Sequence, residues 1–424
     1  MTRLAVRLRR FRRLFILLAV IGPGLITTNA GNDAGAIATY SQAGAEFGYQ
    51  MLWILALITV SLAVVNEMSA RMGVVTGKGL ADLIRERFGV RGTTLAMVLL
   101  LVANAVTTMA EFAGVAAALE LFHVPKYASV PLVAIAIWLL ITRGSYPVVE
   151  RVLLSIGVVY LAYIVSGIVS HPDWGEVIRS TLVPHPVPSL NYFLLAIGLI
   201  GTTIAPWMLF YLQSSVAEKG IPNEQLPYSR VDAISGAIFA DVVAFFIIVA
   251  AAVALYGKLD AATLANMQAA DYARALEPVV GSAAFILFGI GLFGASLLSG
   301  GVVPLSTAYT VTEAFGWERG VGHRMADAPA FFGIFTGLIV IGCLAVLIPG
   351  VPLVSLILLS QEINGLILAA ILVFMMVLVN DRRIMGRYVN GRLINTIAWA
   401  TVALLVSLIG LLLAFSIPGS PLSG

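Results

Sequence analysis

Residues 27–35 read Thr-Thr-Asn-Ala-Gly-Asn-Asp-Ala-Gly, a polar stretch inside the long apolar run 14–45. A membrane-spanning helix needs about 20 apolar residues, so this run is long enough to cross a bilayer. Backbone groups that leave a helix within a membrane must be satisfied by protein or by a water-filled cavity. We therefore expect the first span to be discontinuous, with its only acidic residue, Asp33, at the break.

The composition places most of the chain in a membrane. Of its 424 residues, 60% are hydrophobic and 11% are charged, whereas about 25% of residues are charged in soluble domains. The single cysteine, Cys343, excludes an intrachain disulfide framework and a cluster of thiolate ligands. We expect a protein whose solvent is the lipid bilayer, with no nucleic-acid partner and no obligate protein partner.

The apolar runs predict an all-α integral membrane protein with eleven transmembrane helices, forming one transporter domain over 1–424. They are too long for the strands of a membrane barrel and lack the alternation of such strands. The eleven runs are 14–45, 50–72, 93–121, 127–142, 149–169, 190–218, 231–256, 279–314, 329–348, 353–379 and 394–416.

The positive charges support this topology. With eleven spans, 21 of the 25 Lys and Arg residues fall on the side of the membrane that holds the N-terminus. Cytoplasmic loops are enriched in Lys and Arg. We expect a multi-pass protein of the inner (plasma) membrane, with residues 1–13 as a basic cytoplasmic tail and the C-terminus outside the cytoplasm.

The sixth run contains a second break signal. It reads Gly-Leu-Ile-Gly-Thr-Thr-Ile-Ala-Pro over residues 198–206, and proline removes a backbone donor and clashes with the preceding helical turn. Two interrupted spans five helices apart predict a five-plus-five inverted repeat, with halves 14–169 and 190–379 and an added helix at 394–416. In such transporters the broken helices meet near the midplane and line the ion site.

Asp33 is the strongest candidate for an ion ligand, because ionisable residues inside a membrane are costly and are commonly functional. The backbone carbonyls of Ala30 and Thr202, freed by the two breaks, would join it. A carboxylate with carbonyls and water is the ligand set of hard divalent cations. The alternative role for Asp33 is to cap a helix end or to pair with a buried cation.

Other polar residues inside the spans give weaker signals. Gln361 and Asn364 lie three residues apart in the tenth span and share a helix face, which predicts a role at the site or in gluing helices together. Three further acids have equal claims to staging an ion or proton and to a structural role: Glu67, Glu111 and Asp241. Glu313 lies near a helix end, where we expect a structural role.

The expected site lacks nitrogen and sulfur ligands. Histidine is the commonest ligand for zinc, copper and nickel, but the four histidines fall in loops or helix ends: His123, His171, His185 and His323. Met208 follows the sixth-span break, on a face that we expect to differ from that of Ala205. The site is therefore expected to be made of oxygen alone.

At these residues the chain resembles the Nramp family of divalent metal transporters. Its first span, from Gly-Pro-Gly at 22–24 to Phe-Gly-Tyr at 47–49 and Leu-Trp at 52–53, matches that family's first helix. Ser-Gln at 360–361 and Asp-Arg-Arg-Ile-Met-Gly-Arg-Tyr-Val-Asn at 381–390 match as well. The resemblance covers nearly the whole chain and implies a LeuT-type fold.

The departures from the family pattern cluster at the expected metal site. The family's Asp-Pro-Gly-Asn reads Asp-Ala-Gly-Ala here, so the liganding asparagine is Ala36. Its Met-Pro-His reads Ala205-Pro206-Trp207, so the thioether ligand is also lost. A second histidine of the family corresponds to Leu212.

The proton route of the family is reduced too. Its third-helix acidic pair is represented by Thr108 and Glu111, so Glu111 is a candidate ion or proton relay. The ninth span lacks the arginine that would complete that route. The same losses make the chain similar to the Nramp-related magnesium transporters.

These observations predict a transporter rather than an enzyme, with Mg²⁺ and Mn²⁺ as transported substrates and no cofactor. Losing a thioether removes discrimination against hard ions, and two alanines, Ala36 and Ala205, leave room for a largely hydrated Mg²⁺. We expect import without proton coupling. The alternatives are a proton-coupled Mn²⁺ or Fe²⁺ symporter using Glu111, an amino-acid carrier of the same fold, and a receptor or scaffold without transport.

Overall fold

The computed structural model describes residues 27, 31–143, 160–260, 263–264, 266–277, 281 and 284–416. Throughout these residues the regular structure is helical, without strands. The expected all-α fold class is confirmed.

The long helices of the described chain follow the predicted apolar runs. They are α4 (Leu52–Thr76), α5 (Leu80–Glu120), α6 (Lys126–Arg143), α10 (Leu190–Thr203), α11 (Pro206–Glu218), α12 (Leu226–Leu255), α16 (Ala284–Phe315), α17 (Pro329–Leu347), α18 (Leu353–Asn380) and α20 (Arg392–Ser416). The shorter helical elements are α3 (Ala34–Phe47), α8 (Tyr160–Val169), α9 (Trp174–Leu182), η2 (Asn223–Gln225), α14 (Ala269–Ala273), η3 (Arg274–Leu276), α19 (Arg382–Met385) and η5 (Gly386–Tyr388).

Nine helical segments of the described residues are long and apolar enough to cross a membrane, with α10 and α11 together forming one of them. The other two expected spans, 14–45 and 149–169, are described only in part, as α3 and α8. Eleven spans, the repeat boundaries and the orientation of the termini therefore stay predictions. The basic tail 1–13 lies outside the described residues.

Helix α5 begins earlier than predicted. The expected span starts at residue 93, but helical structure begins at Leu80 and passes through Gly89, whose φ of 66° is non-helical. That left-handed conformation is accessible to glycine at little cost. A short helix that begins at Leu80 thus joins the apolar span at a kink. The prediction missed this helix because the residues before 93 do not form a continuous apolar run.

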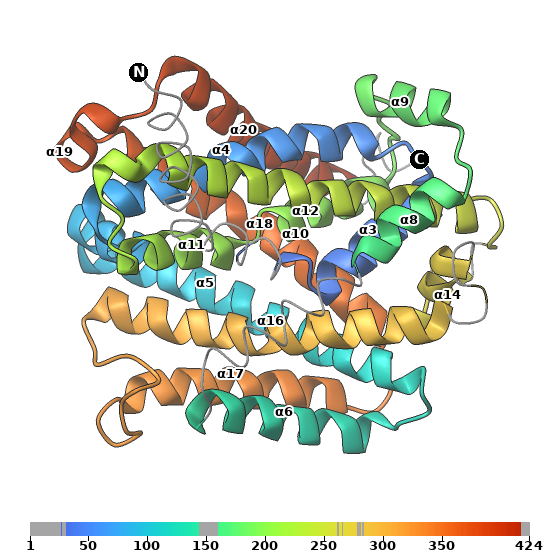
Figure 1. The fold of residues 1–424 in the computed structure, drawn as a ribbon, viewed down its shortest axis with the longest axis horizontal. Helices are drawn as coiled ribbons and strands as arrows, with labels where there is room; N and C mark the ends of the chain where they lie inside the picture. The colour runs from blue at the N-terminus through green and yellow to red at the C-terminus, as the bar shows by residue number, and fades with distance from the viewer. Residues whose placement is uncertain are drawn as a thin grey trace, which may run out of the picture.

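The helices are arranged in packed layers around a central group. In Figure 1, α6 and α17 lie along one side of α16, and α4 and α12 lie on the opposite side of the molecule. Between these layers run α3, α10 and α18, which contact one another. The discontinuous elements α3, α10 and α11 therefore lie inside the protein, where freed backbone groups can be satisfied.

Glycines allow the central helices to touch backbone to backbone. A Cβ on Gly201 of α10 would lie 2.2 Å from the carbonyl oxygen of Gln361 on α18, and one on Gly44 of α3 would lie 2.4 Å from that of Ile248 on α12. Small residues at membrane helix interfaces permit this approach. The central helices are thereby held at fixed separations around the two breaks.

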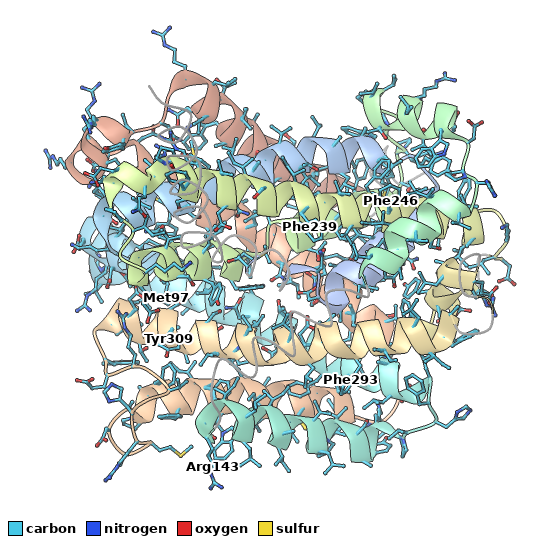
Figure 2. The ribbon with its side chains drawn as sticks, viewed as in Figure 1. Met97, Arg143, Phe239, Phe246, Phe293 and Tyr309 are labelled. Carbon is cyan, nitrogen blue, oxygen red and sulfur yellow. The ribbon has the colours of Figure 1, made fainter. Side chains whose placement is uncertain are left out.

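Aromatic side chains pack the periphery. Phe246 of α12, labelled in Figure 2, lies against Gly167 of α8, where a Cβ would be 2.6 Å from its ring. Its ring centroid is 6.4 Å from that of Trp174 on α9, in an edge-to-face arrangement. Such aromatic pairs add to the apolar area that they bury, so α8 and α9 are fixed to α12.

Candidate functional site

The sixth-span break is confirmed at the predicted place. Helix α10 ends at Thr203, and Ile204 and Ala205 leave the helical conformation with ψ of 66° and 137°. Helix α11 restarts at Pro206. Proline suits the first helical position, because its missing N–H would have no partner there and its φ is preset. The proline thus ends one half-helix and begins the other.

The first-span break lies at Asn32 and Asp33, which are non-helical between Gly31 and α3. Asp33 is the N-cap of α3, and its carboxylate accepts a hydrogen bond of 2.8 Å from the backbone N–H of Ala36. The capping role considered for Asp33 is therefore present. It leaves the remaining carboxylate lone pairs available, since a carboxylate can accept about four hydrogen bonds. Ala30, the other expected carbonyl ligand, lies outside the described residues.

The two breaks meet, and Met208 is where they touch. A Cβ on Gly31 would lie 2.8 Å from the terminal methyl of Met208 and 3.1 Å from its sulfur. The Met208 side chain therefore lies beside the first break, and the expectation that its face differs from that of Ala205 stays a prediction. The chain is extended at Ala205 rather than helical, so the helical spacing from Ala205 to Met208 does not predict the direction of this side chain. The Met208 thioether therefore lies beside Gly31, which precedes Asp33 by two positions in the sequence.

Glu111 of α5 comes directly to the first break. Its Oε2 accepts a hydrogen bond of 3.4 Å from the backbone N–H of Ala34, and its carboxyl group neighbours that of Asp33. The other oxygen of Glu111, Oε1, has no hydrogen-bond partner among the described residues. Asp33 is 3% exposed and Glu111 is fully buried. Two carboxyl groups thus share a site closed to water, so Glu111 is adjacent to Asp33 rather than a distant relay.

Gln361 of α18 faces the same break. A Cβ on Gly35 would lie 1.9 Å from its Nε2 and 3.0 Å from Oδ1 of Asp33, so only glycine fits between them. The Gln361 amide donates to Ser360 Oγ at 2.9 Å and accepts from Asn364 at 3.3 Å. As placed, the nitrogen of this amide faces the break, and a cation would require the amide to turn over and present its oxygen.

Asn364 positions Gln361 rather than facing the break itself. Its Nδ2 also donates to Thr107 of α5 at 2.9 Å, and its Oδ1 has no partner. The sequence predicts that Gln361 and Asn364 share a helix face but gives no indication of Thr107. A threonine four residues before Glu111 in an apolar helix carries no distinct signal, because its hydroxyl commonly bonds its own helix.

The remaining expected positions are buried, Thr202 and Ala205 at the sixth-span break and Ala36 in the first turn of α3. Thr202 is 2% exposed, Ala205 3% and Ala36 fully buried. Thr202 lies in the last turn of α10, where helix carbonyls lack a following turn and the helix dipole is negative. Both effects favour a cation near its carbonyl oxygen. Its hydroxyl is buried without a partner.

Ser296 of α16 is a further polar group at the site that the sequence did not indicate. A Cβ on Gly114 of α5 would lie 2.3 Å from Ser296 Oγ and 2.5 Å from Cβ of Ala34. The Ser296 hydroxyl, fully buried, has no partner. Gly114 thus lets α5, α16 and the start of α3 converge beside Asp33.

Two other intramembrane acids form ion pairs with arginines. Glu67 forms ion pairs with Arg71 at 3.0 Å and with Arg230 at 2.7 Å. Glu313 pairs with Arg319 at 3.0 Å. Asp241 of α12 forms no ion pair with the described residues.

The ligand chemistry at the breaks is that of oxygen with one neighbouring thioether. Across the described residues, no group of three or more His, Cys, Asp and Glu side chains is arranged to hold a metal ion. The histidines lie in connections outside the helix cores, as predicted: His123, His171, His185 and His323.

Comparisons with known proteins agree with this arrangement. The family model "Natural resistance-associated macrophage protein-like" matches residues 24–415. The chain is 32% identical over 415 residues to a divalent metal cation transporter MntH of Ralstonia nicotianae, covering 92% of this chain and 89% of that protein. It is 30% identical to MntH of Aeromonas hydrophila, covering 95% and 96%.

Solved structures share the fold. A manganese transporter of Eremococcus coleocola, in complex with an aromatic bis-isothiourea substituted compound, superposes with a TM-score of 0.77 at 21% identity, covering 96% of this chain and 89% of that one. A nucleobase-cation-symport-1 family transporter with bromovinylhydantoin bound gives 0.56 at 14% identity, covering 94% of each chain. These likenesses confirm the expected LeuT-type architecture.

Proposed function

Since the chain belongs to the Nramp family, the natural resistance-associated macrophage protein-like transporters, we propose that it carries the divalent metal ions Mg²⁺ and Mn²⁺ across the plasma membrane. The relatives named above are divalent metal cation transporters. The metal is the transported substrate, and binding occurs where the two helix breaks meet.

The adjacent carboxyl groups of Asp33 and Glu111 are the observation that carries this proposal. They neighbour each other in a closed site, and none of the ion pairs among the described residues includes either of them. Two buried carboxylates repel each other unless a proton or a cation lies between them. A divalent cation neutralises both at once.

The proposed ligands are the Asp33 carboxylate, the backbone carbonyls of Ala30 and Thr202, and the Gln361 side-chain oxygen after its amide turns over. Ala36 and Ala205 contribute space and no ligand, and Glu111 supplies the second charge. Mg²⁺ gives up water reluctantly and binds through one or two carboxylates with several waters retained. The absence of nitrogen ligands in this set favours Mg²⁺ and Mn²⁺ over later transition metals.

Met208 gives Mn²⁺ a ligand that Mg²⁺ does not use. Thioethers bind softer metals, whereas Mg²⁺ takes oxygen. Its sulfur lies beside Gly31 rather than at Ala205, so it lies near the edge of the proposed site. We therefore expect both ions to be transported, with Met208 contributing to Mn²⁺ alone.

Transport is proposed to run without proton coupling. No histidine lies at the breaks, and the membrane potential alone drives a divalent cation inward by roughly 4.6 kcal/mol per 100 mV. The contact between Glu111 and Asp33 is the one observation that favours the alternative, a proton-coupled Mn²⁺ symporter, because Glu111 would then release its proton when the metal arrives.

Asp33→Asn tests the metal site, because asparagine keeps the shape and the capping oxygen but removes the charge. Metal binding to the purified protein is measured by calorimetry with Mg²⁺ and Mn²⁺, and uptake is measured in proteoliposomes. We expect loss of both. Asp260→Asn, a change in an exposed loop, is the matched control. Wild-type binding of either ion by Asp33→Asn would overturn the assignment.

A further inference from the structure

Asp241 is a buried acid that the metal site does not use. It lies midway along α12 and is 4% exposed, whereas Phe239 on the same helix is 38% exposed (Figure 2). One of its carboxylate oxygens, Oδ2, has no hydrogen-bond partner in the part of the chain that the structure describes. Acids in membrane helices are costly and commonly mark ion or proton sites.

The hydroxyl groups near Asp241 are shared with other hydrogen-bond acceptors. Thr59 of α4 is its hydrogen-bonding neighbour, but the Thr59 hydroxyl donates to the carbonyl of Leu55 at 2.8 Å. Tyr40 of α3 lies within electrostatic range of Asp241.

The Tyr40 hydroxyl also has another hydrogen-bond partner. It lies 2.8 Å from Thr203 Oγ1, and Thr203 itself donates to the carbonyl of Leu199 at 2.8 Å. The hydrogen between Tyr40 and Thr203 therefore comes from Tyr40. Among the described residues, the hydrogen-bonding neighbour of Asp241 is the Thr59 hydroxyl, and this hydroxyl also bonds the Leu55 carbonyl.

No other charge near Asp241 compensates it in the described chain. On α3 and α10 the facing groups are Tyr40 and Thr203, and α4 offers Thr59, while Glu67 further along is occupied by its two arginines. The described part of α8 holds tyrosines and no acid or base. At the end of α12, Arg274 of η3 pairs with Asp271.

We propose that Asp241 is a binding site for one monovalent cation, a proton or Na⁺, and that its occupancy is linked to metal affinity at Asp33. The carboxylate supplies one negative charge, and Thr59 supplies a lone pair that accepts from a protonated carboxyl or coordinates Na⁺. One charge and few ligands suit a single monovalent ion, since a divalent ion buried there would retain a net charge.

The linkage runs through α3 and α10. Tyr40 follows Asp33 by two helical turns, and Thr203 is the neighbour of Thr202 at the end of α10. The hydrogen bond between Tyr40 and Thr203 joins α3 and α10, the two elements that form the metal site. Tyr40 is also within electrostatic range of the Asp241 carboxylate. Occupancy of Asp241 also changes the charge that a metal at Asp33 experiences. This second part rests on the proposed metal transport, whereas cation binding at Asp241 does not.

Infrared difference spectra of the purified, metal-free protein test the site directly. In an Asp33→Asn/Glu111→Gln background, which removes the buried carboxyl pair of the metal site, we expect a protonated carboxyl band that disappears at high pH or on adding Na⁺ and is absent when Asp241→Asn is added. Glu224→Gln, which changes an exposed acid on η2, keeps the band. If neither pH nor Na⁺ changes the carboxyl signal of that background, or if the changes persist when Asp241→Asn is added, the site is refuted, whatever the metal result.

Uptake of Mn²⁺ in proteoliposomes tests the linkage. At fixed pH, external Na⁺ is exchanged for choline; at fixed Na⁺, pH is varied, so the two arms separate Na⁺ from the proton. We expect one arm to change the wild-type KM about five-fold or more, the usual range for linked sites. Asp241→Asn should flatten that dependence with uptake retained, and Thr59→Val should shift its midpoint. Dependence on both arms that is unchanged in Asp241→Asn would refute the linkage.

Discussion

Gly35→Ala perturbs the contact between the first break and α18 by a single methyl group. A Cβ at this position would lie 1.9 Å from Nε2 and 2.4 Å from Cδ of Gln361, and both distances are too short for a non-bonded contact of a carbon atom. The clash is with a flexible side chain, so the Gln361 amide must move away from the first break. It then loses the hydrogen bonds to Ser360 and Asn364, of 2.9 and 3.3 Å.

The size of the effect follows from the loss of one metal ligand. A polar contact to a charged group contributes about 1.5–3 kcal/mol. If Gln361 binds the metal, displacing its oxygen should lower the metal affinity about 12- to 150-fold. Uptake of Mg²⁺ and Mn²⁺ into proteoliposomes should show KM raised within that range.

Gly198→Ala is the matched control. It adds the same methyl group on α10, facing α18, but the nearest atom, Cγ of Glu362, would lie at 3.5 Å, an ordinary contact. Its KM should stay within roughly two-fold of wild type. The double variant Gly35→Ala/Gln361→Ala should be no worse than Gln361→Ala alone, because both changes remove one contact. A wild-type KM for Gly35→Ala would refute the placement of Gln361 at the metal.

Three further variants test the ligand set. Ala205→Met restores a thioether at the break, so we expect Mg²⁺ uptake to fall relative to Mn²⁺; an unchanged uptake ratio would show that Ala205 does not line the site. Met208→Leu removes the sulfur beside Gly31 and should weaken Mn²⁺ binding by calorimetry about five-fold while Mg²⁺ is unaffected; equal effects on both ions would show that Met208 only packs. Glu111→Gln halves the negative charge at the site, so the affinity for both ions should fall about ten-fold or more; wild-type affinities would place Glu111 outside the metal field.

The sequence predicts the helical fold because the bilayer imposes simple rules. Apolar runs must be long enough to cross it, and Pro206 cannot continue the helix that precedes it. The kink of α5 was missed because the polar segment before residue 93 forms a helix outside the apolar run. Its conformation at Gly89 depends on backbone freedom, which glycine permits but does not require.

The site was predicted less completely, for reasons of local geometry. Asp33 was identified because an isolated acid in an apolar span is costly. The position of Met208 beside Gly31 could not be predicted, because helical spacing does not apply across the extended residue Ala205. Ser296 and Thr107 carry no signal, since serine and threonine in membrane helices usually bond their own backbone. The contact between Glu111 and Asp33 depends on the packing of α5 against α3 at Gly114, which only the folded chain fixes.

The central claim is that Mg²⁺ and Mn²⁺ pass through the site at Asp33 without a proton. It is tested most directly by recording metal uptake and internal pH together in the same proteoliposomes, with an inside-negative potential and no pH gradient. We predict saturable uptake of both ions that disappears in Asp33→Asn, with no internal acidification during uptake. Acidification that follows metal entry in proportion would contradict this account and establish proton-coupled symport through Glu111.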